Sequence, residues 1–354
     1  MVDFEKSAKY FRRCLSALPD FCTPLCCNRL SVAFFCISGL DILNELEILG
    51  DKLDVINWIY SFQLISPESR NPEELKKCGF KGSLYATDVF QFQSGRLLKG
   101  NESRSHLDTS HIAMTYTGLS CLIIMGDDLS GVDRSAISAG IKALQLENGN
   151  FCCTLGGSES DMRFVYCAAA ICSILDDWSG INKELTTKFI VDAIGYDGGI
   201  GNESDNESHG GLTYCGVAAL HLMGTLPSAL SRTQVKNLMK WCLMRQITGF
   251  QGRPNKPPDT CYSFWVGATL KILESYGFVD KVPLQHFTMS AYDQVTGGIA
   301  KWPENHPDPL HSYLGLAGLS LSGNEKLKPI DPALNISVSA FEHLRSIHKR
   351  WSGK

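Results

Sequence analysis

The stretch GFQGRPNKPPDTCYSFWVGATLKIL, residues 249–273, contains the whole unit from which this chain is built. It opens with a glycine–aromatic turn at Gly249 and Phe250, continues as a polar loop with three prolines, and ends in an apolar segment. In the apolar segment, Trp265 is followed two positions later by Gly267. Proline is excluded from helix interiors, so the pattern predicts a stiff loop and then a helix that opens near Trp265.

The same unit recurs along the chain with a period of about 50 residues. Equivalent turns stand at 79–80, 150–151, 199–200 and 298–299, and equivalent aromatic–small pairs are Tyr116/Gly118, Tyr166/Ala168, Tyr214/Gly216 and Tyr313/Gly315. A second amphipathic segment follows each apolar one, as at Asp133 and Ser231, which are typical helix N-caps. A fixed period indicates one repeated supersecondary unit, here a helical hairpin.

Helical hairpins can stack openly as a solenoid or close into a ring. The small residues two positions after each aromatic residue favour a closed double ring with closely packed inner helices, and a solenoid is the alternative. We therefore predict an all-α fold, an α–α barrel (toroid), in a single domain over residues 1–354. Its parts are N-terminal helices in 1–65, the repeats in about 75–325 and a C-terminal helix in about 331–350.

The composition is that of a globular protein, with 44% hydrophobic and 20% charged residues. A net charge of −4 gives no basic stripe for nucleic acid and no polybasic membrane anchor. No apolar run reaches the roughly 18 residues that a membrane span needs, and charges in the first ten residues exclude a signal peptide. We expect a cytosolic protein whose cysteines are mostly reduced and buried.

In a ring, the polar loops before the inner helices would meet at one rim. Asp259, Cys261 and His311 fall in two such loops, and together they form a zinc ligand set with one open position, as catalytic zinc sites have. A capping carboxylate, a buried thiol and a core histidine would explain the same residues, because no paired metal motif anchors the site.

The remaining polar residues of these loops suit an anion. Arg253 and Lys256 lie on the proline-stiffened loop and, with His209 and the Tyr262 hydroxyl, could clamp a diphosphate. A solvated basic loop is the alternative. Aromatic residues near the inner-helix starts would coat a funnel for a long apolar ligand, or simply fill the core. They are Phe34, Phe35, Tyr116, Tyr166, Tyr214 and Trp265.

Five strings resemble the β subunits of protein prenyltransferases, and the resemblance covers nearly the whole chain. They are SHIAMTYTGLSCLIIMGDDLS (110–130), DMRFVYCAA (161–169), SHGGLTYCG (208–216), GRPNKPPDTCYSFWVGATLKIL (252–273) and GGIAKWPENHPDPLHSYLGLAGLS (297–320). The resemblance implies an α–α barrel that works as a heterodimer with a helical-repeat α subunit. It implies that Asp259, Cys261 and His311 bind one Zn²⁺.

The resemblance also implies roles for the other loop residues. His209, Arg253, Lys256 and Tyr262 match diphosphate-binding positions, and Arg163 matches a further position in the cavity. Phe35 and Leu310 match positions that line the pocket for the last residue of a C-terminal CaaX motif.

Two positions distinguish subtypes within the family. Ser31 stands where farnesyl-transferring relatives carry a bulky Trp, which would leave room for a fourth isoprene unit; related chains often carry Thr at this position. Lys301 replaces an aspartate that is tied to magnesium in those relatives, so Mg²⁺ would not be required. Both favour geranylgeranyl transfer to CaaX proteins such as small GTPases, with Leu or Phe preferred at X. Farnesyl-transferring or Rab-specific relatives, and a non-catalytic toroid that binds no zinc, are the alternatives.

Overall fold

The computed structural model describes residues 2–17, 27–65, 71–83, 90–93, 96–99 and 109–353. Most of the longer helices fall into two sets. The inner helices are α2 (Arg29–Ile42), α5 (Ile112–Ile124), α7 (Met162–Leu175), α9 (Gly210–Met223), α12 (Tyr262–Ile272) and α14 (Pro309–Leu321). The outer helices are α3 (Lys52–Tyr60), α6 (Arg134–Leu144), α8 (Lys183–Asp192), α11 (Arg232–Leu243) and α13 (Lys281–Ser290). Among the described residues, no helix is long and apolar enough to cross a membrane.

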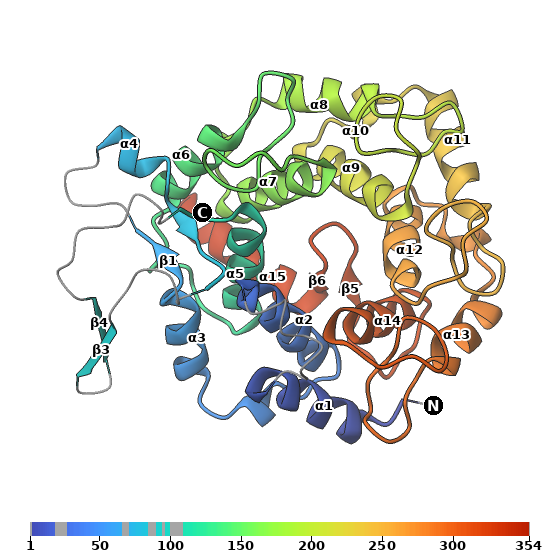
Figure 1. Ribbon diagram of the computed structural model, residues 1–354, viewed down its shortest axis with the longest axis horizontal. Helices are drawn as coiled ribbons and strands as arrows, with labels where there is room; N and C mark the ends of the chain where they lie inside the picture. The colour runs from blue at the N-terminus through green and yellow to red at the C-terminus, as the bar shows by residue number, and fades with distance from the viewer. Residues whose placement is uncertain are drawn as a thin grey trace.

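The inner helices form a closed ring (Figure 1). Each packs against the next in chain order, and α14 packs against α2, which joins the last repeat to the first. The N-terminal helix α1 (Phe4–Ser16) packs on α2 beside this joint, where the Ser7 hydroxyl donates to the Gly297 carbonyl at 2.8 Å. The fold is therefore the α–α toroid that the repeat predicts, and the solenoid alternative is wrong.

The glycine after three of the aromatic residues makes room for the turn of its own repeat; these are Gly118, Gly216 and Gly315. A Cβ added at Gly118 would lie 3.0 Å from Phe80, and one added at Gly315 would lie 3.0 Å from Ile299. Both turn residues are completely buried. In these repeats the glycine lets one apolar turn residue pack closely against the inner helix. A Cβ at Gly267 would instead meet Tyr276 and Leu321.

The inner helices begin earlier than the aromatic pattern predicts. Each aromatic residue lies at the fourth or fifth position of its helix and not at its opening. The reason is N-capping: His111, Asp161, His209 and Asp308 each accept a hydrogen bond from a backbone N–H of the following turn. The N-caps expected at Asp133 and Ser231 on the outer helices are present.

Short elements complete the described chain. They are η2 (Leu46–Leu49), α4 (Pro72–Leu75), α10 (Leu226–Ala229), η3 (Tyr276–Phe278) and three antiparallel strand pairs, β1 (Gln63–Leu64) with β2 (Gly79–Phe80), β3 (Phe90–Gln93) with β4 (Arg96–Lys99), and β5 (Ile330–Asp331) with β6 (Ile336–Ser337). These strands are too short for alternation to be detected in the sequence. Residues 18–26, within the expected N-terminal helical region 1–65, lie outside the described residues.

The C-terminal helix, α15, spans Val338–Trp351 and not the expected 331–350. The preceding residues form the β5–β6 hairpin, in which Asn335 adopts a left-handed φ of 57° that a helix cannot contain. The Ser337 side chain then caps α15 by accepting from the Ala340 N–H at 3.1 Å.

The β5–β6 hairpin projects into the middle of the ring (Figure 1). Tyrosine hydroxyls from four inner helices donate to the carbonyl groups of its turn. The bonds are Tyr116 to Leu334 (2.8 Å), Tyr166 and Tyr214 to Ala333 (3.1 and 3.3 Å), and Tyr313 to Asn335 (2.8 Å). The hairpin therefore connects four inner helices through hydrogen bonds, and we call it the hub.

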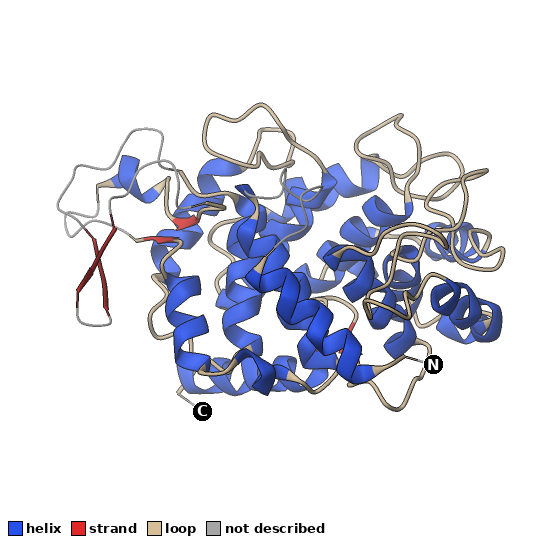
Figure 2. Cartoon of the chain, turned by 60° about the horizontal axis from the view of Figure 1, so that its bottom comes forward, coloured by secondary structure: helices blue, strands red, loops and turns tan. Residues whose placement is uncertain are grey.

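The long loops before the inner helices gather along one edge of the ring (Figure 2). They comprise residues 145–161, 193–209, 244–261 and 291–308. We call this edge the mouth. The repeat places every loop that carries a candidate functional residue there.

Removing one hub hydroxyl should destabilise the protein. Tyr313→Phe leaves the buried Asn335 carbonyl without this donor, which should cost about 1–3 kcal/mol of unfolding free energy. The control is Tyr196→Phe, which alters a fully exposed phenol. Urea unfolding of the purified protein measures both, and equal midpoints for the two variants would show that the hub bond contributes no stability.

Candidate metal and diphosphate site

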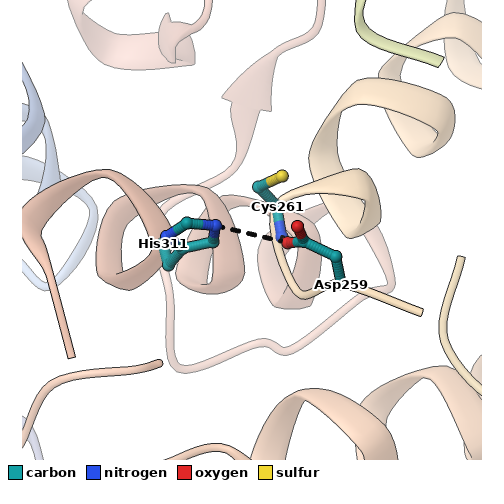
Figure 3. Close-up of side chains that lie close together, drawn as sticks. All are labelled: Asp259, Cys261 and His311. Atoms are coloured by element: carbon teal, nitrogen blue, oxygen red, sulfur yellow. Dashed lines mark hydrogen bonds and ion pairs between the residues drawn. The ribbon is translucent and has the colours of Figure 1, made fainter. Parts of the chain in front are cut away.

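Asp259, Cys261 and His311 meet at the mouth (Figure 3). Asp259 lies in the loop before α12, Cys261 immediately precedes α12, and His311 is the third residue of α14. One ligand atom from each lies within 4.8 Å of the other two. The structure thus brings together the three residues that the sequence grouped, and it draws them from two neighbouring repeats.

The loop that carries Asp259 and Cys261 is fixed by its backbone. The Asp259 Oδ1 accepts the Cys261 N–H at 3.0 Å, which turns the two side chains to one side despite their spacing of two. Between them, Thr260 donates its N–H to the Lys301 carbonyl at 3.0 Å and its hydroxyl to the Ala300 carbonyl at 2.7 Å. The two repeats that supply the cluster are therefore joined next to it.

His311 is oriented by Asp308, the N-cap of α14. The Asp308 carboxylate accepts the His311 backbone N–H at 2.9 Å and its ring Nδ1–H at 2.6 Å. With Nδ1 engaged, Nε2 is left facing Asp259, 3.4 Å from Oδ1. A histidine held by a carboxylate in this way has its other nitrogen fixed in direction, as metal-binding histidines commonly do.

The charges of the cluster are strongly coupled. Burial would raise the pKa of Asp259, but its hydrogen bonds with His311 and Cys261 lower it. Burial also opposes the charged form of His311, yet Asp259 and Asp308 outweigh it and raise the pKa of His311 to about 9. Burial and the Asp259 carboxylate raise the pKa of the Cys261 thiol. Without a metal, His311 supplies the positive charge that the buried carboxylate needs.

This donor set fits a zinc ion. One carboxylate, one thiol and one imidazole are zinc's preferred donors, and three protein ligands leave one position for a substrate. Asp259 and Cys261 are buried and His311 is 16% exposed at its side chain, so the cluster can still be reached from the mouth. The ion pair between His311 and Asp259 explains why these two side chains meet without a metal, and the thiol of Cys261 completes a set of three donors beside them.

Lys301 lies beside the same carboxylate. Its Nζ is 3.8 Å from Asp259 Oδ2 and 4.5 Å from the centre of the Trp302 ring, and its side chain is 41% exposed. The glycines before it, Gly297 and Gly298, are in contact with α1, because a Cβ at either position would collide with Lys6 or Tyr10. The N-terminal helix therefore supports the loop that presents Lys301.

His209 and Tyr262 form a second polar group at the mouth. His209 caps α9 by accepting the Gly211 N–H on Nδ1 at 3.0 Å, so its proton is carried on Nε2. Nε2 lies 2.9 Å from the Tyr262 hydroxyl and donates to it. Burial and the Arg253 charge lower the pKa of His209, which keeps this neutral tautomer. The phenol hydrogen is then left to donate to a ligand.

Glycine permits this pairing. A Cβ at Gly252 would lie 2.1 Å from the Tyr262 ring, and one at Gly210 would lie 3.1 Å from it. The Gly210 N–H also donates to the Gly252 carbonyl at 2.8 Å, which links the loops of two repeats.

The basic residues expected at the mouth are accessible. Lys256 is exposed, and Arg253 donates from Nη1 to Glu207 at 2.8 Å with 40% of its side chain exposed. Arg163 lies in the first turn of α7, 59% exposed at its side chain, and pairs with Asp161 and Glu159. The structure does not bring Arg163 into contact with the metal cluster or with Tyr262.

The apolar residues divide into two groups. Phe35, Trp265 and Leu310 are partly exposed next to the core. Ser31 is half-buried on the first turn of α2, with its hydroxyl 3.8 Å from the Met114 sulfur. Phe34 is fully buried, so the simple core interpretation applies to it. Tyr116, Tyr166 and Tyr214 are also buried, and their hydroxyls bond to the hub.

Two residues of the site were missed in the sequence. Asp308 could have been found, because Asp followed by Pro309 is a typical N-cap signal three residues before His311. Glu207, the partner of Arg253, gave no signal beyond its charge, because its loop lies in a different repeat.

Comparisons with known proteins show the family to which the chain belongs. The model of the prenyltransferase alpha-alpha toroid domain family matches residues 2–336. The chain is 40% identical over 345 residues to the geranylgeranyl transferase type-1 subunit beta of Dictyostelium discoideum, covering 96% of both chains. It is 40% identical over 322 residues to the subunit of the same name from Arabidopsis thaliana, covering 88% of this chain and 83% of that one.

The chain also matches relatives of lower sequence identity. The chain is 35% identical over 229 residues to the geranylgeranyl transferase type-2 subunit beta of Saccharomyces cerevisiae, covering 63% of this chain and 70% of that one. The structure also resembles a solved Candida albicans protein geranylgeranyltransferase-I complexed with GGPP, with a TM-score of 0.83, 25% identity and coverage of 97% and 98%. On this sequence and structural evidence, the chain belongs to the prenyltransferase α–α toroid family, among the type I geranylgeranyl transferase β subunits.

Proposed function

We propose that this chain is a catalytic β subunit that transfers a geranylgeranyl group from geranylgeranyl diphosphate to the cysteine thiol of a C-terminal CaaX motif. The observation that carries the proposal is the convergence of Asp259, Cys261 and His311 at the mouth. Relatives that match over nearly the whole chain bear the name of this enzyme class.

Asp259, Cys261 and His311 would hold one zinc ion. When bound, zinc supplies the positive charge that keeps a substrate thiol deprotonated near neutral pH. Asp308 fixes the imidazole so that Nε2 faces the ligand set, and Thr260 fixes the loop that carries the other two ligands. The thiolate would then attack C1 of the lipid, and diphosphate would leave.

The leaving diphosphate would be stabilised by His209, Arg253, Lys256, Tyr262 and Lys301. His209 donates to the Tyr262 oxygen, which polarises the phenol toward a phosphate oxygen. Arg253 and Lys256 would supply charge from the stiff loop, and Lys301 would supply charge beside Asp259 of the metal cluster. A lysine there can neutralise the departing charge, so we expect no requirement for Mg²⁺.

The lipid and the CaaX peptide would share the apolar surface below the mouth. Phe35 and Leu310 are partly exposed and could contact the last peptide residue, for which Leu or Phe is expected. Ser31 would leave the space that a fourth isoprene unit needs, with Trp265 on α12 and Tyr166 on α7 each two helices away from α2 around the ring. Arg163 would contribute charge at the rim.

The working form would be a heterodimer with a prenyltransferase α subunit, acting on CaaX proteins such as small GTPases in the cytosol. The described cysteines form no disulfide bonds, which suits a reducing compartment. The defining assay is transfer from labelled geranylgeranyl or farnesyl diphosphate to CaaL and CaaS peptides with the α subunit present. Farnesyl preference would favour the farnesyl class, and no transfer with no bound zinc would favour a binding toroid.

Cys261→Ala should abolish both zinc retention and transfer, because two ligands cannot hold the metal against dialysis. Metal analysis of the purified heterodimer measures retention, and peptide geranylgeranylation measures turnover. Cys242→Ala is the control, since it removes a buried thiol from outer helix α11. Full zinc content with wild-type turnover in Cys261→Ala would refute the ligand assignment.

Ser31→Trp should shift lipid choice towards farnesyl diphosphate by about tenfold or more, because the indole would fill the space beside Met114. Competition between the two diphosphates for one peptide gives the ratio directly. Ser31→Thr adds only a methyl group and should keep the wild-type ratio. If Ser31→Trp also keeps it, this position does not determine lipid length.

A further inference from the structure

One contact at the mouth joins a carboxylate to a cation of the diphosphate group. Arg253 Nη1 donates to Glu207 Oε2 at 2.8 Å. The Arg253 side chain is 40% exposed and that of Glu207 is 60% exposed, so a ligand can reach both. Exposed pairs of this kind contribute little net stability. Arg253 can therefore exchange Glu207 for a more highly charged partner at little cost.

The backbone fixes the position of this pair. Glu207 and Arg253 come from loops of consecutive repeats, and the Gly210 N–H to Gly252 carbonyl bond of 2.8 Å ties these loops together within three residues of both side chains. The carboxylate therefore remains near Arg253 even when the side chains part.

The pair also lies next to His209 and Tyr262. Glu207 precedes His209 by two residues, and Gly252, which is in van der Waals contact with the Tyr262 ring, precedes Arg253. The charges of Arg253 and Glu207 act on His209 in opposite directions, which places both near its ring. A diphosphate bound by His209, Tyr262 and Arg253 would thus meet a negative charge from Glu207.

We propose that Glu207 is a displaceable counter-ion of Arg253. The Glu207 carboxylate pairs with the guanidinium before the lipid diphosphate binds, and it lowers the affinity of the site for inorganic diphosphate after transfer. The proposal rests on the function proposed above. Cations without a counter-ion would retain the multiply charged product, and a nearby carboxylate offsets part of that attraction. Glu207 then favours product release and acts through Arg253 as a positioning residue, without touching the reacting atoms.

A second possible role for Glu207 predicts a change of diphosphate affinity in the opposite direction. If Glu207 only anchored Arg253 in a binding geometry, its loss would weaken diphosphate binding. If it competes with diphosphate for Arg253, its loss strengthens binding. The sign of the change therefore separates the two roles.

The test is Glu207→Gln in the purified heterodimer, with inorganic diphosphate as the probe. Calorimetric titration and inhibition of transfer should both show about threefold to tenfold tighter diphosphate binding at low salt. The gain should shrink at about 0.5 M salt, where exposed charges are screened. Glu207→Asp retains the charge and should stay close to wild type.

Glu203→Gln, an exposed carboxylate in the same loop, is the matched control and should leave diphosphate binding unchanged. Unchanged or weaker binding in Glu207→Gln would overturn the proposal. Arg253→Met separates this failure from failure of the proposed function. If Arg253→Met weakens diphosphate binding while Glu207→Gln does not strengthen it, only the counter-ion role is wrong. If Arg253→Met has no effect, the diphosphate site itself is wrong.

Discussion

The capping of the inner helices at one edge of the ring is the constraint on which the site depends. A helix start leaves backbone N–H groups that need acceptors, and here the acceptors are side chains with a second task. Asp308 caps α14 and orients His311, while His209 caps α9 and donates to Tyr262. The same hydrogen bonds that begin these helices also fix the direction and tautomer of the chemical groups. Folding and site geometry therefore cannot be separated at the mouth.

The helical hairpins and the meeting of the metal-site residues at one edge could be predicted from the sequence, because the same sequence pattern recurs in every repeat. A turn, a loop and an apolar segment that recur every 50 residues or so predict the hairpins, and ring closure then places Asp259 and His311 at one edge. The contacts between repeats left no such pattern. The hydrogen bonds from Arg253 to Glu207 and from Tyr166 to Ala333 join residues far apart in the sequence, which only the folded ring brings together. The hairpin was missed because strands of two residues carry no periodicity.

Each candidate cation at the mouth except Lys256 has a described carboxylate nearby. Lys301 lies beside Asp259, Arg253 beside Glu207, and Arg163 beside Asp161. Buried or clustered like charges are costly unless they are paired. If the mouth binds a diphosphate as proposed, its cations would need other partners before the ligand binds. Exposed carboxylates serve this purpose best, because solvent weakens their hold. Arg163, which also contacts the largely buried Asp161, is held more firmly than Arg253 and is less suited to exchanging partners.

The position of the hub changes the expected shape of the lipid site. The tyrosines that bind the β5–β6 turn lie four or five residues into their helices, about 6 Å below the helix starts at 1.5 Å per residue. The hairpin occupies the axis of the ring at that depth (Figure 1). If the chain binds a geranylgeranyl group as proposed, we expect the lipid to bend across the ring above the hairpin, because it is much longer than this depth. On this proposal, the space at the level of the first helical turns would determine which lipid fits, and Ser31 lies in the first turn of α2.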